Sequence, residues 1–147
     1  MNRLLLGLCM TVAFAPTLAA DGIDEVIEIH DLRAIVEIPE NVRQSMRDLM
    51  RQHLSDLQEI QQALAESNFN RAADIAEFSL GLSSLGPRNT RQGSYMPAGM
   101  RHLGVEMHRA SSRLALAAQE ADMPKSLAGL SEVTGICVGC HASYRAR

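Results

Sequence analysis

Apolar residues recur at every third or fourth position over a long stretch in the first half of the chain, with charged residues between them. This spacing places the apolar side chains on one helix face and predicts a helix over about residues 40–66. Pro39 stands where that helix would begin, at a position where a missing amide donor costs nothing. The expected inward face consists of Val42, Met46, Leu49, Met50, His53, Leu57, Ile60 and Leu64.

A second, shorter helix is expected over about residues 70–80. Asn70 is the expected N-cap, because its side-chain oxygen can accept a hydrogen bond from a free amide of the first turn. After this helix, residues 83–95 contain a cluster of glycine, proline and asparagine residues. Such a cluster is typical of turns and predicts a long surface loop.

Two further periodic segments complete the chain. One predicts a helix over about residues 97–121, and the sequence Asp122-Met123-Pro124 then breaks the pattern and begins the last helix. The expected inward face of that last helix consists of Leu127, Leu130, Val133, Cys137, Cys140, His141 and Tyr144.

Four amphipathic helices in one small domain pack most simply as an antiparallel four-helix bundle, so the expected fold is all-α. This domain would span residues 39–147. Residues 21–38 before it are ambiguous. Ile23, Val26, Ile27 and Ile29 are strand-like, but the segment is short and acidic, which also fits a loosely packed N-terminal arm.

Residues 1–20 have the three parts of a secretory signal peptide. A charged start ending in Arg3 precedes an apolar run and a stretch of small residues that ends at Ala20. The alternative is an uncleaved anchor, but the apolar run is shorter than the ~20 residues that span a bilayer. Cys9 lies inside this run and is discounted. We therefore expect cleavage near Ala20 and export to the periplasm, without stable membrane insertion.

The C-terminal region contains the sequence Cys137-Val138-Gly139-Cys140-His141. This C-x-x-C-H pattern is typical of covalent haem attachment. Two thiols three positions apart lie on one side of a helical turn, where they can bond to the two vinyl groups of one porphyrin. The adjacent imidazole can then ligate the iron. The motif predicts one haem c, bound through Cys137, Cys140 and His141, with His141 as the metal ligand.

Other interpretations of the cysteine pair are weaker. A structural zinc site needs four ligands, and the sequence contains no second C-x-x-C or H-x-x-x-H pair. A redox dithiol would follow a strand at a helix N-terminus, whereas these cysteines lie late in a helix. A plain disulfide would leave His141 without a role.

Composition agrees with a bound macrocycle. The chain has eight methionines, no tryptophan and only 3% aromatic residues, so a large apolar cofactor would supply much of the core's bulk. The net charge is −3. This mild acidity offers no general attraction to nucleic acid or to an anionic membrane surface.

The helical pattern that ends in Cys137 to Arg145 resembles the class II c-type cytochromes, the cytochrome c-prime family and its low-spin relatives. The resemblance extends over roughly residues 40–147, and it is sharpest in the C-terminal motif. It implies thioether attachment at Cys137 and Cys140, His141 as the proximal ligand, and Arg145 near the proximal face. A homodimer would fit the family.

The sixth iron position is open to several interpretations. In an antiparallel bundle, Met46 lies at the depth of His141, with Met50 and Met100 less directly placed. The alternatives are that these methionines only fill the core, or that the iron is five-coordinate with an apolar distal pocket. His53 is expected to lie too deep to reach the iron.

The remaining basic side chains near the expected site have weaker assignments. His102 and His108 lie at the edge of the apolar stripe of their helix and are expected to be surface histidines. Arg43 and Arg47 can pair with the haem propionates, or they form only the solvated face of their helix.

These features together predict a periplasmic monohaem electron carrier rather than an enzyme. Its expected partners are periplasmic redox proteins and the cytochrome c maturation machinery. The alternative is a five-coordinate haem protein that binds or sequesters nitric oxide or carbon monoxide. The state of the sixth iron position separates these two functions.

Overall fold

The structure, a computed structural model, describes residues 31–86 and 91–147, and its compact unit begins at Asp31. The predicted signal peptide and the strand-like residues Ile23 to Ile29 lie outside the described residues. The compact unit therefore starts within the segment predicted as an arm, eight residues before the expected start of the helical domain.

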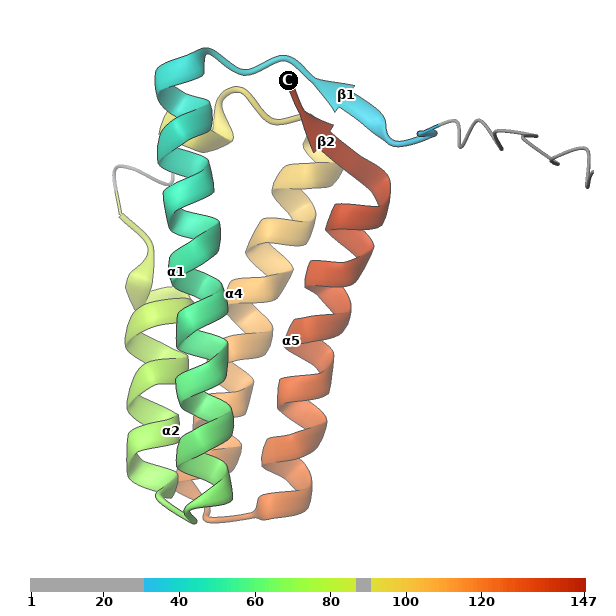
Figure 1. The fold of residues 1–147 in the computed structure, drawn as a ribbon. Helices are drawn as coiled ribbons and strands as arrows, with labels where there is room; N and C mark the ends of the chain where they lie inside the picture. The colour runs from blue at the N-terminus through green and yellow to red at the C-terminus, as the bar shows by residue number, and fades with distance from the viewer. Residues whose placement is uncertain (1–30, 87–90) are drawn as a thin grey trace, which may run out of the picture. The chain divides into compact units, whose positions relative to one another are not determined.

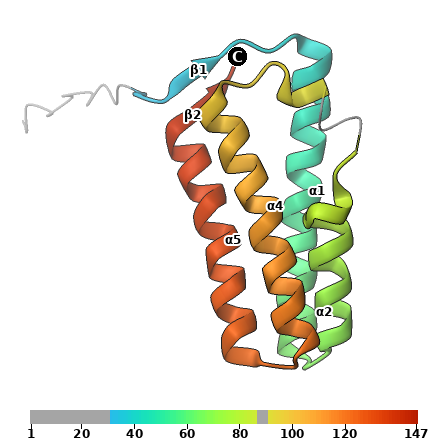
Figure 2. The same cartoon turned by 180° about the vertical axis from the view of Figure 1, so that it is seen from behind.

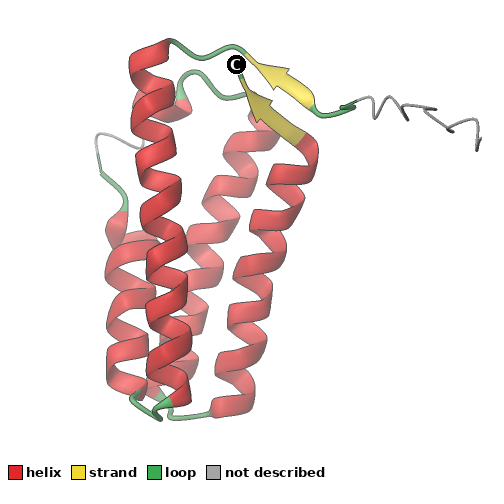
Figure 3. Cartoon of the chain, in the orientation of Figure 1, coloured by secondary structure: helices red, strands yellow, loops and turns green. Residues whose placement is uncertain are grey.

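Most of the described chain is helical (Figure 3), which confirms the expectation of a mainly α-helical protein. The elements are α1 (Glu40–Ala65), α2 (Phe69–Ile75), the π-helical η1 (Ala76–Leu80), the 3-10 turn η2 (Leu82–Ser84), α4 (Ala98–Gln119) and α5 (Met123–Ser143). Within the described segments, no helix has the length and apolar character that crossing a membrane requires.

The connection from α1 to α2 shows why one cap prediction is wrong. Ser67 has a φ of 57°, a left-handed conformation that ends α1. Asn68 follows immediately, and its side-chain oxygen accepts a hydrogen bond from the Arg71 amide at 3.2 Å. Asn68 is therefore the N-cap in place of Asn70, and α2 begins one residue earlier than predicted.

The last helix ends before the last residue of its predicted inward face. It ends at Ser143, so Tyr144 does not lie on a helix face but begins a short strand. Leu127, which was expected to point inward, is 51% exposed. Leu130 and Val133 are buried as predicted. Asp122 caps this helix by accepting a hydrogen bond from the Lys125 amide at 2.9 Å.

Two short strands join the ends of the compact unit. Strand β1 (Ala34–Val36) pairs in parallel with β2 (Tyr144–Ala146), and Ala34 lies opposite Tyr144. Figure 1 shows this pair across one end of the helices. The hydrogen bond from the Ile38 amide to the Arg147 carbonyl oxygen, at 3.1 Å, extends the pairing. The last part of the predicted arm is thus an ordered strand directly beside the end of α5.

The four helices lie side by side when seen from the front and from behind (Figures 1 and 2). Helix α4 packs against α5 and α2, and α1 packs mainly against α2 and η1. Two separate groups of buried side chains hold the unit together. The main core joins α1, α2, η1, α4 and α5 around residues such as Ile60, Leu114 and Val133. A smaller end cluster consists of Val36, Ile38, Val42 and Met46, with Met96, Met100 and Tyr144 against it.

Candidate functional site

A cavity of about 1120 Å³ lies between the main core and the end cluster. Its wall contains Met107 and Ile136, which pack against or belong to the main core, and Met46 and Tyr144 from the end cluster. Ligand pockets in proteins usually measure roughly 300–1,000 Å³. The two groups of buried side chains are therefore separated by a space large enough for a sizeable organic group.

One wall of this cavity is formed by the last turns of α5. Cys137, Cys140 and His141 all line it, so the structure brings the three predicted site residues to the same space. The two cysteines are half-buried and carry free thiols. Their i, i+3 spacing in a regular helix puts both thiols on one face. The helix therefore gives the two thiols the shared face that their spacing in the sequence predicts.

The environment of the thiols differs from that of a reactive dithiol. Burial raises the pKa of the Cys137 thiol, and burial together with the neighbouring Cys137 raises the pKa of Cys140. Redox-active C-x-x-C pairs instead have lowered pKa values at helix N-termini. The position of this pair near the carboxyl end of α5 gives the opposite electrostatic environment. The structure therefore favours thiols that remain protonated until they are modified.

The lining contributed by α1, α4 and the segment before α4 is rich in methionine. Met46, Met50 and Met100, the three predicted candidates for a distal ligand, all line the cavity. Met96 and Met107 line it too and were not predicted. Met46 is 8% exposed and packs within the end cluster, whereas Met50 is 38% exposed. The structure brings the candidates together but does not single out one of them as a ligand.

Two histidines also line the cavity, and the prediction for one of them is wrong. His108 is not a surface residue, because it is only 6% exposed and its Nδ1 donates a hydrogen bond to the Leu80 carbonyl oxygen at 2.7 Å. Leu80 ends η1, so this acceptor comes from a distant segment that helix periodicity does not reveal. His102 is exposed, as predicted.

His53 and His108 lie close together in the lining of the cavity. Their ring centroids are 6.4 Å apart and the rings are nearly perpendicular. Burial lowers the pKa of His53, with a further contribution from His108, while Asp56 acts in the opposite direction. His53 was predicted to lie too deep for the iron, and it stands thirteen residues into α1, roughly 20 Å along the axis. It nevertheless belongs to the wall of the same cavity as His141.

Arg43 carries the only buried side-chain nitrogen or oxygen that lacks a hydrogen-bond partner among the described residues, namely its Nε. Its guanidinium forms an ion pair with Glu40, and Arg47 pairs with the same carboxylate at 3.6 Å. Both arginines line the cavity. A buried donor without an acceptor is rare in proteins. The Arg43 guanidinium as a whole lines the cavity and can bind the carboxylate of a group placed there.

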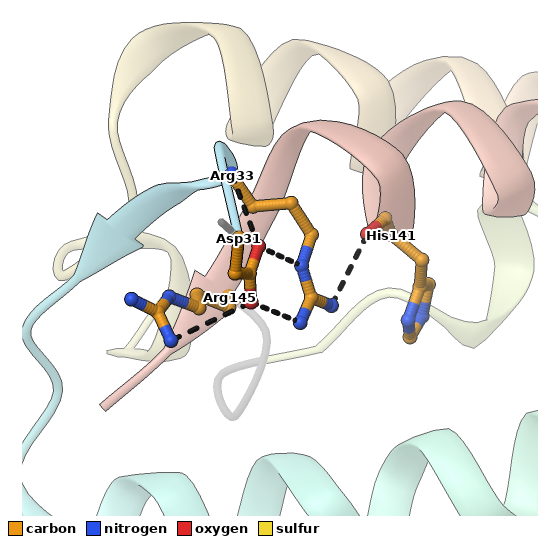
Figure 4. A network of polar contacts seen from close by, with 4 residues as sticks. All are labelled: Asp31, Arg33, His141 and Arg145. Atoms are coloured by element: carbon orange, nitrogen blue, oxygen red, sulfur yellow. Dashed lines mark hydrogen bonds and ion pairs between the residues drawn. The ribbon is translucent and has the colours of Figure 1, made fainter. Parts of the chain in front are cut away.

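A network of charged residues holds the carboxyl end of α5 (Figure 4). Asp31 accepts two hydrogen bonds from the Arg33 guanidinium, at 2.9 and 2.6 Å, and forms an ion pair with Arg145 at 3.4 Å. Arg33 also donates to the main-chain carbonyl oxygen of His141 at 3.5 Å. The Arg33 guanidinium holds the pKa of Asp31 well below its usual range. The sequence predicted a role only for Arg145.

The walls fit a flat, largely apolar group with acidic substituents. Thiols and an imidazole come from α5, thioethers come from α1, α4 and the segment before α4, and the Arg43 guanidinium can bind a carboxylate. Gly104 also lines the cavity, and a Cβ atom built there meets no atom within 4 Å. The backbone of α4 therefore leaves room for a group to approach closely. A porphyrin with two propionates has these properties.

No cluster of three or more histidine, cysteine or acidic side chains that could bind a free metal ion occurs among residues 31–86 and 91–147. Comparisons of the chain with protein-family models, with curated proteins and with solved structures found no match. Conclusions about the site therefore depend on its own residues.

Proposed function

We propose that this protein is a periplasmic c-type cytochrome with one covalently bound haem, and that it carries single electrons. The supporting observation is that one cavity is lined by Cys137, Cys140 and His141 from α5 and by a set of thioether side chains from other elements. The cavity also separates two groups of buried side chains that would otherwise pack against each other. A haem between them would complete a single core.

We further propose that the helices form an antiparallel four-helix bundle of the cytochrome c-prime type. Short connections support this arrangement, because α1 passes to α2 through Glu66 to Asn68, and α4 passes to α5 through Glu120 to Asp122. Short connections between helices favour antiparallel neighbours. In this arrangement the end of α5 lies level with the starts of α1 and α4, which agrees with the packing of Met100 and Tyr144 against the end cluster that contains Met46.

The motif residues have distinct chemical roles in this proposal. Each thiol of Cys137 and Cys140 would add across one vinyl group, so that a carbon–sulphur bond forms and the thiol hydrogen passes to the neighbouring vinyl carbon. This addition needs no oxidant, but it requires free thiols. The His141 imidazole would provide the axial nitrogen ligand. The haem supplies a one-electron iron couple when bound.

The rest of the cavity would tune this couple. Arg43 would bind a propionate through its guanidinium group, which lines the cavity. The thioether and leucine side chains exclude water from the distal face and lower the local polarity, which is one of the means by which proteins set a haem potential. His108 is engaged with the Leu80 carbonyl oxygen, and by helix rise it lies well below the level of His141. This position does not favour acid–base catalysis at the iron, so we propose no enzymatic turnover.

One observation favours a second candidate function, the binding of nitric oxide or carbon monoxide. Met46 is the best-placed distal candidate by depth, yet its side chain is packed among Val36, Ile38 and Val42 in the end cluster. If Met46 remains there, the sixth iron position stays open to a diatomic ligand. Carbon monoxide binding to the reduced protein would support this function, and a low-spin spectrum that the gas leaves unchanged would support the carrier function.

Mass spectrometry of the protein made in a host competent for cytochrome maturation tests the proposal. The expected mass is that of the mature chain plus one haem, with both thioethers located on the peptide that contains Cys137 and Cys140. The variant Cys137→Ala/Cys140→Ala should lack covalent haem, whereas the outward-facing Val138→Ala should retain it. An unmodified mass for the wild-type chain would contradict the proposal. Rapid steady-state oxidation of substrates by peroxide would contradict the proposed absence of turnover.

A further inference from the structure

Among the described residues, six arginines line the cavity, whereas no aspartate or glutamate does so. They come from four different parts of the fold: the segment before β1, α1, α4 and β2. We call this set the arginine rim, and it consists of Arg33, Arg43, Arg47, Arg51, Arg101 and Arg145. The whole chain has a net charge of −3. A positive region in an acidic protein therefore needs a physical explanation.

Ion pairs within the chain neutralise only part of the arginine rim. Asp31 pairs with Arg33 and Arg145, Glu40 pairs with Arg43 and Arg47, and Asp48 pairs with Arg51. Three carboxylates thus face six guanidinium groups, which leaves three positive charges in excess around the cavity. Arg101 has no carboxylate partner in the described part of the chain, and its guanidinium donates to the Met96 carbonyl oxygen.

A bound haem would not balance all of this charge, because its two propionates would offset two of the three excess positive charges. Arg43, which lines the cavity, is the arginine proposed to bind one propionate. The outer members of the rim are open to solvent, since the side chains of Arg47 and Arg51 are 52% and 65% exposed. Exposed guanidinium groups of this kind act on molecules that approach from outside.

Exposed apolar side chains are neighbours in the sequence of residues that line the cavity. Val138, between the two cysteines, is 68% exposed, and Leu32, next to Arg33, is 93% exposed. Neither of them lines the cavity itself. Interfaces between proteins commonly combine a small apolar centre with a polar, charged surround in which arginine is enriched. The arginine rim and the exposed Leu32 beside Arg33 supply these two components.

We infer that the arginine rim is a docking surface for an acidic patch on a partner protein. The inference rests on the proposed function in one respect, because it identifies the partner as a redox protein that exchanges electrons at this edge of the cavity. The excess positive charge would steer an acidic partner toward the haem edge and align it there. An acidic protein patch fits better than a nucleic acid or an anionic membrane, because the excess positive charge is confined to the arginine rim of a chain whose net charge is −3.

Binding of a short polyglutamate peptide to the loaded protein at low ionic strength tests the inference. The test variant is Arg51→Gln/Arg101→Gln, which removes two exposed members of the rim outside the proposed haem contacts. The matched control is Arg109→Gln/Arg113→Gln, which removes two arginines that are paired with Glu106 and Glu132 and do not line the cavity. Heteronuclear NMR shifts should map the peptide to the rim, and only the test variant should bind it more weakly.

Electron transfer provides a second readout. Oxidation of the reduced protein by the anion ferricyanide should slow by about threefold to tenfold in the test variant at low salt. Oxidation by a cationic cobalt complex should not slow. The difference should shrink at 0.15 M salt, where screening acts over about 8 Å. Equal effects of the test and control variants would overturn the inference.

The outcomes separate this inference from the proposed function. One outcome is that the wild type carries covalent haem but binds polyglutamate no better than the test variant. This result would leave the proposed function intact and overturn the docking surface. Tighter binding of single-stranded DNA or of phosphatidylglycerol vesicles through the same arginines would also overturn it, in favour of a nucleic acid or a membrane surface. Absence of covalent haem would contradict the proposed function itself, and with it the identity of the partner.

Discussion

The guanidinium of Arg33 lies 3.5 Å from the main-chain carbonyl oxygen of His141, although 108 residues separate them in the sequence. The same guanidinium is held by Asp31, which also pairs with Arg145. The last carbonyl groups of a helix have no partner within the helix. Arg33 supplies one, at the residue proposed to ligate the iron. The segment before β1 thus contacts the backbone that carries the imidazole proposed as the proximal ligand.

Replacement of Arg33 by glutamine tests this positioning role. We expect Arg33→Gln to retain covalent haem and to change the melting temperature by less than about 2 °C, because exposed ion pairs contribute little to stability. The reduction potential and the NMR resonances of the His141 ring should shift, because the carbonyl loses its charged donor. Arg71→Gln, which breaks the exposed pair with Glu59, is the control. Equal spectra and potentials for the wild type and Arg33→Gln would show that Arg33 has only a structural role.

Replacement of Met46 by leucine tests the distal side. Leucine has a similar volume, so packing in the end cluster should cost less than about 1.5 kcal/mol. Because Met46 packs with Val36 and Val42, we expect the visible spectra of the oxidised and reduced protein to stay unchanged. Loss of a low-spin spectrum in Met46→Leu, but not in Met50→Leu, would instead identify the Met46 sulphur as the sixth ligand.

The contact between α4 and α5 depends on Gly129. A Cβ atom at this position would lie 3.1 Å from the Cα atom of Leu114, which belongs to a backbone that cannot easily move. We expect Gly129→Ala to lower the free energy of unfolding by about 1–2 kcal/mol, because overpacking outweighs the gain in helix propensity. Chemical denaturation measures this change.

Gly135→Ala is the matched control in the same helix. A Cβ atom at Gly135 meets no atom within 4 Å, and this residue does not line the cavity. The substitution should therefore raise the free energy of unfolding by up to about 1 kcal/mol through helix propensity alone. Stabilisation by both substitutions would show that the α4–α5 contact is looser than described.

The half-buried His53 predicts a pH dependence of stability. Burial lowers its pKa in the folded protein below the ordinary value of 6.5, so the unfolded chain binds more protons between the two pKa values. Stability therefore rises with pH across this window and falls as the pH drops below about 6.5. The melting temperature of the loaded protein should be lower at pH 5.5 than at pH 7.5.

His53→Gln should reduce this difference, since glutamine does not titrate. His102→Gln, at an exposed position on α4, should leave it unchanged. The groups that influence His53 are His108 from α4 and Asp56 from α1 itself. A pH dependence that is the same in the wild type and in His53→Gln would assign the effect to other titrating groups.

The sequence alone determined the features that depend on neighbours along the chain. Apolar periodicity located α1 and α4 to within two residues at each end, and the spacing of Cys137, Cys140 and His141 ordered the motif on one side of α5. Both follow from the fixed geometry of a helix, in which residues three and four positions apart always share a face.

Only the tertiary structure decided which distant groups meet. The burial of His108 depends on the Leu80 carbonyl oxygen, and the bond that Arg33 makes to the end of α5 depends on the parallel pairing of β1 with β2. The periodicity of apolar residues does not reveal such contacts, because the two partners lie 28 and 108 residues apart in the sequence. The gathering of six arginines around one cavity has the same cause, since four separate segments supply them and their shared position arises only when the helices pack.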